Sequence, residues 1–239
     1  MKKNDRRSRP RRIIFFLGRI LFLAVFLSIA TVLLLRWVPP PTSAFMVGNH
    51  LAVLFSVEKH TSIRYQWCDW DGISPYMPLA VLAAEDQKFV HHSGFDFDSI
   101  AKAVESNKKG RRLRGASTIT QQVAKNLFLW PGRSYLRKGL EAYFTVLLEL
   151  MWPKKRILEV YVNIAQFGEG IYGAHAAAEM VFRKKPAHLK EGEAALLAAV
   201  LPNPLVLKAK KPSPYVLERK RWITGQMRQL NGTSYLRDL

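Results

Sequence analysis

The residue best placed for chemistry is Glu85, which follows the apolar run "PLAVLAA". A carboxylate that emerges from an apolar helix face loses hydration, and this loss raises its pKa toward the range of a general base or acid. The alternative is an ordinary solvated glutamate at a helix end. Local sequence alone leaves both interpretations open.

Two adjacent histidines, His91 and His92, follow in the same polar stretch. Neighbouring residues point in different directions on any regular element, so the pair lacks the i, i+4 spacing of zinc ligands on a helix. We therefore favour a structural role, in which a histidine bonds a backbone group or a carboxylate, over a metal site.

A second polar group begins after the basic run "RRLRG", where a glycine leads into a hydroxyl-rich helix start. Free backbone N–H groups at a helix start, together with nearby Lys and Arg, favour an anion. A solvated polar face is the competing interpretation. The polar residues that share one side of this helix are Ser117, Gln121, Gln122, Lys125 and Asn126.

A third candidate, Glu141, stands four residues after Arg137, a spacing at which two side chains can pair on a helix surface. Because a largely apolar helix follows, Glu141 is also a candidate for a second, partly buried carboxylate. Between these groups lies "LFLWPG", residues 127–132, whose large apolar side chains are unusual in a solvated loop. They either enter a bilayer interface or pack in the core.

The composition fits one sizeable domain with an appendage, since the chain has 239 residues and 49% of them are hydrophobic. The formal net charge is +19, from 37 basic and 18 acidic residues. Such a charge indicates an anionic partner: nucleic acid, anionic lipid or a phosphorylated substrate. Cys68 is the single cysteine, so no intrachain disulfide can form.

The N-terminal region predicts a membrane anchor. Residues 1–12 form a basic tail, and residues 13–35 form an apolar run that, at ~1.5 Å per residue, crosses a ~30 Å hydrocarbon core. The run is too long for an ordinary signal-peptide core, and no small-x-small cleavage site follows it. The basic flank predicts a cytoplasmic N-terminus, with the rest of the chain outside the cytoplasmic membrane. This placement argues against a nucleic-acid partner.

Beyond the anchor, the pattern predicts a stem and a mainly helical domain. Three prolines stop the anchor, residues 36–74 form a membrane-proximal segment, and "SIRYQW" is the best short strand candidate. Residues 75–239 show no run of alternating strands. Thr118 with Gln121 has the spacing of a capping box. The predicted helices cover residues 78–90, 97–110, 117–130, 134–152, 153–168, 172–182, 189–201 and 213–230.

Five segments between about residues 75 and 205 carry a resemblance to a known family. "EDQKFVHHSG" resembles the E-D-x-x-F-x-x-H-x-G motif of the family-51 glycosyltransferases, which polymerise peptidoglycan glycan strands. "GASTITQQVAKN" and "RKGLE" are similar to the next two motifs, and residues 155–184 and 191–204 to the fourth and fifth. The chain departs from the family at Val162, where leucine is usual, and at Val181, where tyrosine is usual. The second departure concerns a ring contact only.

The resemblance implies a lysozyme-like helical glycosyltransferase domain with a membrane-dipping subdomain. It implies that lipid II is polymerised: the 4-hydroxyl of an acceptor sugar attacks C1 of a donor sugar, undecaprenyl pyrophosphate leaves, and the new β-1,4 link has inverted configuration. The protein is then a single-pass protein of the bacterial inner membrane with a periplasmic catalytic domain. The implied partners are lipid II, the growing lipid-linked glycan strand, the membrane, and cell-division or other wall-synthesis proteins.

The matched positions imply roles for individual residues. Glu85 is the catalytic base, and Lys125 and Arg133 contact the phosphates. Glu141 is the second catalytic glutamate, which either orients an Arg or Lys or holds a divalent cation, Mg or Mn, against the pyrophosphate; no other cofactor is expected. The remaining implied substrate-binding residues are Ser117, Gln121 and Asn126.

Chain length favours the monofunctional members of the family. The 35 residues that follow Pro204 are too few for the transpeptidase domain of the bifunctional members, so no transpeptidase activity is expected. The S-x-x-K pattern at Ser56, Ser99 and Ser106 lacks the accompanying S-x-N and K-T-G, and we give it no weight. Three alternatives stay open: a glycan-cleaving lysozyme-like enzyme, a membrane-tethered wall or division scaffold, and a membrane-tethered DNA binder.

Overall fold

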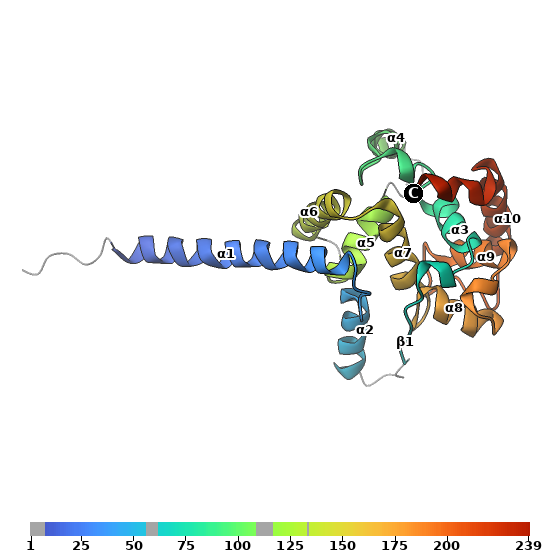
Figure 1. Cartoon of the computed structure of the whole chain (residues 1–239), viewed down its shortest axis with the longest axis horizontal. Coiled ribbons are helices and arrows are strands. Elements are labelled where there is room, and N and C mark those ends of the chain that lie inside the picture. Colours follow the sequence, from blue (N-terminus) through green and yellow to red (C-terminus); the bar gives the residue numbers. More distant parts are fainter. Residues whose placement is uncertain (1–7, 56–61, 109–116, 133) are drawn as a thin grey trace, which may run out of the picture. The chain divides into compact units, whose positions relative to one another are not determined.

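The computed structural model describes residues 8–55, 62–108, 117–132 and 134–239. The chain divides into two compact units, Met1–Val38 and Pro39–Leu239. The described part of the first unit holds helix α1 (Ser8–Leu35), in which 24 residues from Arg12 to Leu35 are apolar enough to span a membrane (Figure 1). At ~1.5 Å per residue this stretch exceeds the ~30 Å of a hydrocarbon core. Helix α1 is therefore a candidate membrane span, at the place where the sequence predicts an anchor.

The second unit is mainly helical, which confirms the predicted fold class. Its α-helices are α2 (Ala44–Phe55), α3 (Tyr76–Glu85), α4 (Phe97–Lys108), α5 (Ile119–Phe128), α6 (Tyr135–Met151), α7 (Lys154–Ile164), α8 (Gly173–Phe182), α9 (Glu191–Val200) and α10 (Pro214–Gln229). Short 3-10 helices lie at η2 (Trp70–Gly72), η3 (Phe89–His91), η4 (Pro186–His188) and η5 (Gly232–Asp238).

A small three-stranded sheet brings distant segments together. Its strands, β1 (Arg64–Tyr65), β2 (Gln166–Gly168) and β3 (Ile171–Tyr172), lie in the order β1-β3-β2, with β1 parallel and β2 antiparallel to β3. The sequence predicts β1 within "SIRYQW", but it wrongly extends helix α7 through residue 168. Gly173 permits the turn from β3 into α8, because it has φ +79° and a Cβ there would lie 2.3 Å from the Asn163 carbonyl oxygen.

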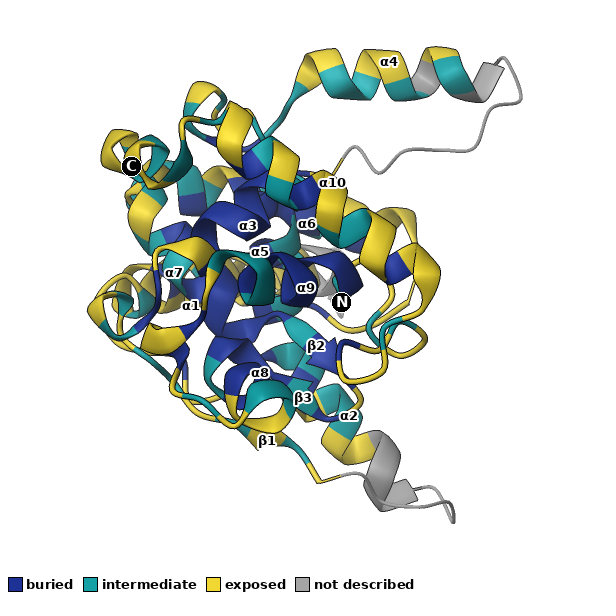
Figure 2. Ribbon diagram, turned by 90° about the vertical axis from the view of Figure 1, so that its right-hand side faces the viewer, coloured by how far each residue is buried: buried dark blue, intermediate teal, exposed yellow. Residues whose placement is uncertain are grey.

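The core of the second unit is built around α3 and α9, whose side chains are almost all apolar. Helix α9 packs against α3 and α10, and α5 packs against α6 and α7. Figure 2 shows α3, α5 and α9 as buried helices at the centre of this unit. Because apolar burial is worth roughly 25 cal/mol per Å², these contacts are the main stabilising force on the fold. The C-terminal residue of α3, Glu85, therefore emerges from the middle of the core.

Helix α3 ends at Glu85, whereas the sequence pattern predicts a helix through Val90. Asp86 has φ −159° and ψ 76°, which is outside the helical region. Its carboxylate accepts a hydrogen bond from the Ile119 backbone N–H (3.0 Å) and lies 2.9 Å from His92 Nε2. These contacts to other segments replace the hydrogen bonds that a longer helix would make, so the predicted boundary is wrong.

Candidate active site

Glu85 lies at the junction of α3, α5 and α10. Its Oε2 accepts a hydrogen bond from Gln122 Nε2 at 3.0 Å, and its Oε1 lies 3.5 Å from Arg219 Nη2. Burial raises the pKa of the Glu85 carboxyl, while the hydrogen bond from Gln122 and the charge of Arg219 oppose the rise. The apolar run before Glu85 thus leads to a desolvated carboxylate, as the first of the two sequence interpretations requires.

The amide of Gln122 is held in one orientation by Tyr161. The Tyr161 hydroxyl donates a hydrogen bond to Gln122 Oε1 at 3.1 Å, which leaves Nε2 to donate to Glu85. Burial raises the pKa of the Tyr161 hydroxyl well above its ordinary value, so the hydroxyl remains a donor. These two hydrogen bonds in series fix the orientation of the Glu85 carboxylate.

Asp86 joins the end of α3 to the start of α5. The Asp86 carboxylate contacts Ile119, the first residue of α5, and His92. The start of α5 is also capped by Thr118, whose side chain forms with that of Gln121 the capping box that the sequence predicts. His92 bonds a carboxylate, which confirms the structural role favoured for that histidine. Asp86 is therefore a positioning residue: it sets where α5 presents Gln122 to its neighbour Glu85.

A cavity of about 960 Å³ opens beside Glu85. The sequence-predicted residues Glu85, Ser117, Gln121, Lys125 and Glu141 all line it. The rest of its lining comes from Ala84, Gln122, Arg137, Lys138, Leu201, Pro202, Tyr215, Arg219 and Trp222. Four of the lining side chains are cationic and two are acidic, so the cavity suits an anion.

Glu141 orients two of these cations. Its Oε2 accepts a hydrogen bond from Arg137 Nη1 at 3.0 Å, and its Oε1 accepts one from Lys138 Nζ. Glu141 is 3% exposed. The sequence offered a surface pair with Arg137 or a partly buried carboxylate, and the structure supports the buried carboxylate. Within the described ranges, no group of three or more His, Cys, Asp or Glu could hold a metal ion. The contacts of Glu141 fit the orienting role better than a metal-binding role.

Lys125 offers the cavity a cation with no close counterion. Its Nζ lies 5.1 Å from the centre of the Phe45 ring, and no carboxylate of a described residue lies within ion-pair distance. Burial lowers the pKa of the Lys125 ammonium, an effect that Glu141 opposes. A partly desolvated ammonium gains from an incoming anion, because the anion replaces lost hydration.

The structure does not bring every predicted residue to the cavity. Asn126 does not line it, and its Oδ1 is buried without a hydrogen-bond partner among the residues that the structure describes. Gln121 lines it, but its side chain is engaged in the α5 cap. Arg133 lies outside the described residues. Sequence reasoning did not assign Arg219 or Trp222 to the site, because no local pattern in the last helix points to them.

The apolar segment 127–132 divides between core and surface. Leu127 and Leu129 are 7% and 2% exposed, and Phe128 stacks on Phe144 with ring centres 4.5 Å apart. Trp130 is 48% exposed. The core alternative therefore holds for the two leucines, whereas the exposed Trp130 leaves entry into a bilayer interface as a prediction for that residue.

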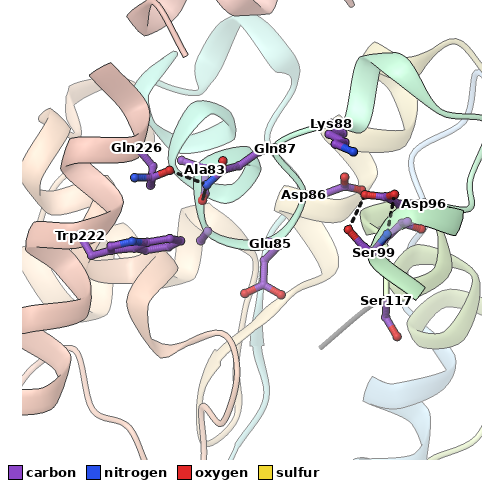
Figure 3. Close-up of a pocket in the computed structure, with 12 residues that line it drawn as sticks. Ala83, Glu85, Asp86, Gln87, Lys88, Asp96, Ser99, Ser117, Trp222 and Gln226 are labelled. Atoms are coloured by element: carbon purple, nitrogen blue, oxygen red, sulfur yellow. Dashed lines mark hydrogen bonds between the residues drawn. The ribbon is translucent and has the colours of Figure 1, made fainter. Parts of the chain in front are cut away.

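A second cavity, of about 440 Å³, lies against Glu85 (Figure 3). It shares Ala84, Glu85, Ser117 and Trp222 with the larger cavity. Figure 3 shows Trp222 on one side of Glu85, and Ser99 and Ser117 on the other. The remaining lining residues are Ala83, Asp86, Gln87, Lys88, Asp96, Thr118 and Gln226. Glu85 thus stands where two cavities of different composition meet.

The chain matches the family model described as Transglycosylase over residues 52–228, a region that includes every lining residue of both cavities. It is 50% identical over 237 residues to the biosynthetic peptidoglycan transglycosylase of Xanthomonas campestris pv. campestris (strain B100), with 98% of this chain and 96% of that one covered. The protein of that name from Shewanella oneidensis is 51% identical over 220 residues, covering 92% and 93%. The one from Mannheimia succiniciproducens is 48% identical over 238 residues, covering 100% and 95%.

Proposed function

The chain belongs to the transglycosylase family and is a peptidoglycan glycosyltransferase, and we propose that Glu85 is its catalytic base. The enzyme polymerises lipid II into β-1,4 glycan strands. The acceptor 4-hydroxyl oxygen forms a bond to C1 of the donor sugar as the bond from C1 to the pyrophosphate oxygen breaks. The electron pair leaves with undecaprenyl pyrophosphate, and the hydroxyl proton passes to Glu85.

The observation that carries this assignment is the place of the Glu85 carboxylate, between the core and a cation-lined cavity. Its raised pKa makes it a better proton acceptor than a solvated glutamate. Gln122 occupies Oε2, whereas the 3.5 Å between Oε1 and Arg219 exceeds the length of a tight charge-assisted bond. We therefore assign Oε1 to the proton.

The pyrophosphate is assigned to the larger cavity. Lys125, Arg137, Lys138 and Arg219 line it, and their charge would neutralise the leaving group, so that no strong general acid is required. Arg137 is held by Glu141 and can present its planar guanidinium to phosphate oxygens as a fork. The phosphate role of Arg133 that the resemblance implies remains part of the proposal.

Glu141 is assigned to orient Arg137 and Lys138 rather than to hold a metal. A buried carboxylate that accepts a bond from one cation on each of its two oxygens keeps both side chains in place and already has its charge balanced. A divalent cation bound by the pyrophosphate itself would still supply charge neutralisation, without a contact from Glu141.

Helix α1 is assigned as a single-pass anchor of the inner membrane, with a cytoplasmic N-terminus and a periplasmic catalytic unit. The basic residues before the span support this orientation. A reporter fused after Leu239 tests it: activity of a periplasm-dependent reporter is expected, and activity of a cytoplasm-dependent reporter alone contradicts it. Protein partners in wall synthesis or division are part of the same proposal and are testable by crosslinking in the membrane.

The test of the catalytic base is Glu85→Gln, which keeps the shape of the side chain and its bond to Gln122. Loss of a general base typically costs ~10²–10⁴ in rate, so polymerisation of labelled lipid II should fall by at least that factor while lipid II still binds. Glu218→Gln is the matched control, because Glu218 is an exposed glutamate next to Arg219 on α10. Near-normal polymerisation by a folded Glu85→Gln variant would refute the assignment.

A further inference from the structure

Helix α10 presents an indole to both cavities. Trp222 lines each of them and is 48% exposed, although it is one of the largest apolar side chains in the chain. The opposite face of α10 is held in the core by Val216, Ile223 and Met227, which are fully buried. The helix therefore packs without help from Trp222. A single exposed apolar residue is ordinary on a protein surface, so the significance of Trp222 rests on its lining both cavities. Trp222 also borders the catalytic carboxylate (Figure 3).

Two more residues share this face of α10. Arg219 and Tyr215 precede Trp222 by three and seven positions, which places all of them on one side of a helix. Both line the larger cavity, and Tyr215 is 57% exposed. This face of α10 therefore extends from the larger cavity, past Glu85, toward the smaller cavity.

The two cavities differ in charge. The cation of the smaller cavity is Lys88, which pairs with Asp98 at 3.0 Å, while Asp86 and Asp96 are acidic members of its lining. Hydrogen bonds from Ser99 hold the pKa of the Asp96 carboxyl below its ordinary value, so that group stays ionised. A phosphate would be repelled there. The hydroxyl and amide groups of a neutral sugar would instead find acceptors and donors.

An indole beside such polar groups suits a sugar ring. A pyranose presents C–H groups on its ring faces and hydroxyl groups around its rim. A broad aromatic face with a negative quadrupole packs against the C–H groups, and the polar lining bonds the rim. A volume of about 440 Å³ falls within the range of small-ligand sites, ~300–1,000 Å³.

We propose that Trp222 is a sugar-stacking platform, and that the smaller cavity is a subsite for phosphate-free rings of the glycan strand on the far side of Glu85 from the pyrophosphate. The proposal rests on the proposed function, which assigns the pyrophosphate to the larger cavity. A ring held on Trp222 would keep the strand beside Glu85 between additions, so the platform would favour longer strands.

The first test measures binding of a tetramer of β-1,4-linked N-acetylglucosamine, which carries no phosphate and no lipid. Calorimetry with the full chain in detergent should detect the tetramer, and Trp222→Ala should weaken binding by up to about tenfold, with Trp222→Phe between the two. Trp130→Ala is the matched control, because Trp130 is exposed to the same extent, 48%, and lines neither cavity. Absence of binding by the wild type, or equal binding by Trp222→Ala, overturns the proposal.

The second test compares strand lengths made from lipid II. Folded Trp222→Ala, with a melting temperature like that of Trp222→Phe, should make shorter strands, whereas Trp130→Ala should make strands of wild-type length in detergent. Strands of unchanged length from Trp222→Ala overturn the proposal. Binding of the tetramer involves no proton transfer, so an error in the assignment of the base would leave the binding result unaffected, and the two failures are distinguishable.

Discussion

Removal of the Asp86 carboxylate should damage both stability and turnover, although Asp86 is not assigned to the chemistry. Its two oxygens bond the Ile119 N–H and His92 Nε2 at 3.0 and 2.9 Å, in a buried setting. Asp86→Ala leaves both partners without an acceptor, and each unsatisfied buried group costs about 1–3 kcal/mol. The expected loss of unfolding free energy is therefore about 2–6 kcal/mol, a large part of a typical total of ~5–15 kcal/mol.

The assay is thermal unfolding of the full chain in detergent, followed by the helical circular dichroism signal, together with lipid II polymerisation. At about 2–4 °C per kcal/mol for a chain of this size, the melting temperature of Asp86→Ala should fall by roughly 4–24 °C. Asp86→Asn should fall less, since its amide oxygen still accepts from Ile119. Turnover by Asp86→Ala should fall even below its melting temperature. Without the bond from Asp86 to Ile119, α5 is held less firmly, and Gln122 on α5 then positions Glu85 less well.

The matched control is Asp98→Ala, which removes an exposed partner of Lys88. The Lys88 side chain is 48% exposed and the Asp98 side chain 74% exposed. Ion pairs at the surface contribute little to stability. If Asp86→Ala melts at the same temperature as Asp98→Ala, the carboxylate does not join α3 to α5 as the distances indicate.

Three further predictions concern charge and the membrane. Arg219→Gln removes a charge that lowers the pKa of Glu85, so the pH at which kcat/KM is lost on acidification should move upward; a downward move contradicts the assignment. Glu141→Gln should reduce polymerisation by the same factor with Mg and with a chelator; a loss seen only with Mg would instead indicate metal binding by this residue. Trp130→Ser should slow polymerisation in vesicles but not in detergent, whereas Leu129→Ser should lower the melting temperature by creating a cavity in the core; reversed results would contradict the division of the segment.

The sequence predicts those features that depend on neighbouring residues. The helical spacing of apolar residues locates the helices. The capping box of Thr118 and Gln121 can be predicted because its two members stand three positions apart. The apolar run before Glu85 makes a desolvated carboxylate one of two interpretations, and the burial of Glu85 in the structure supports that one. Residue types place Lys125 on one polar side of its helix, the resemblance assigns it to the phosphates, and the structure places it in the lining of the cavity.

The features that the sequence does not reveal depend on contacts between distant segments. Helix α3 ends at Glu85 because Asp86 bonds residues on η3–α4 and α5, and no local signal marks that end. The contribution of Arg219 requires that α10 pack on α3 and α9, which is a tertiary contact. Leu129 and Trp130 are adjacent and similarly apolar, so only packing decides which of them is buried.

The place of α10 as the last α-helix has a consequence for the timing of activity during synthesis. Glu85, Gln122 and Glu141 belong to α3, α5 and α6, and they leave the ribosome before Arg219 and Trp222 on α10 do. Until α10 docks on α9 and α3, the cavity lacks one wall and Glu85 has no cationic neighbour from that side. A chain in which α10 has not docked would therefore hold the proposed base and most of the cations of the cavity yet remain a poor polymerase, and activity would begin only when α10 had packed on α9 and α3.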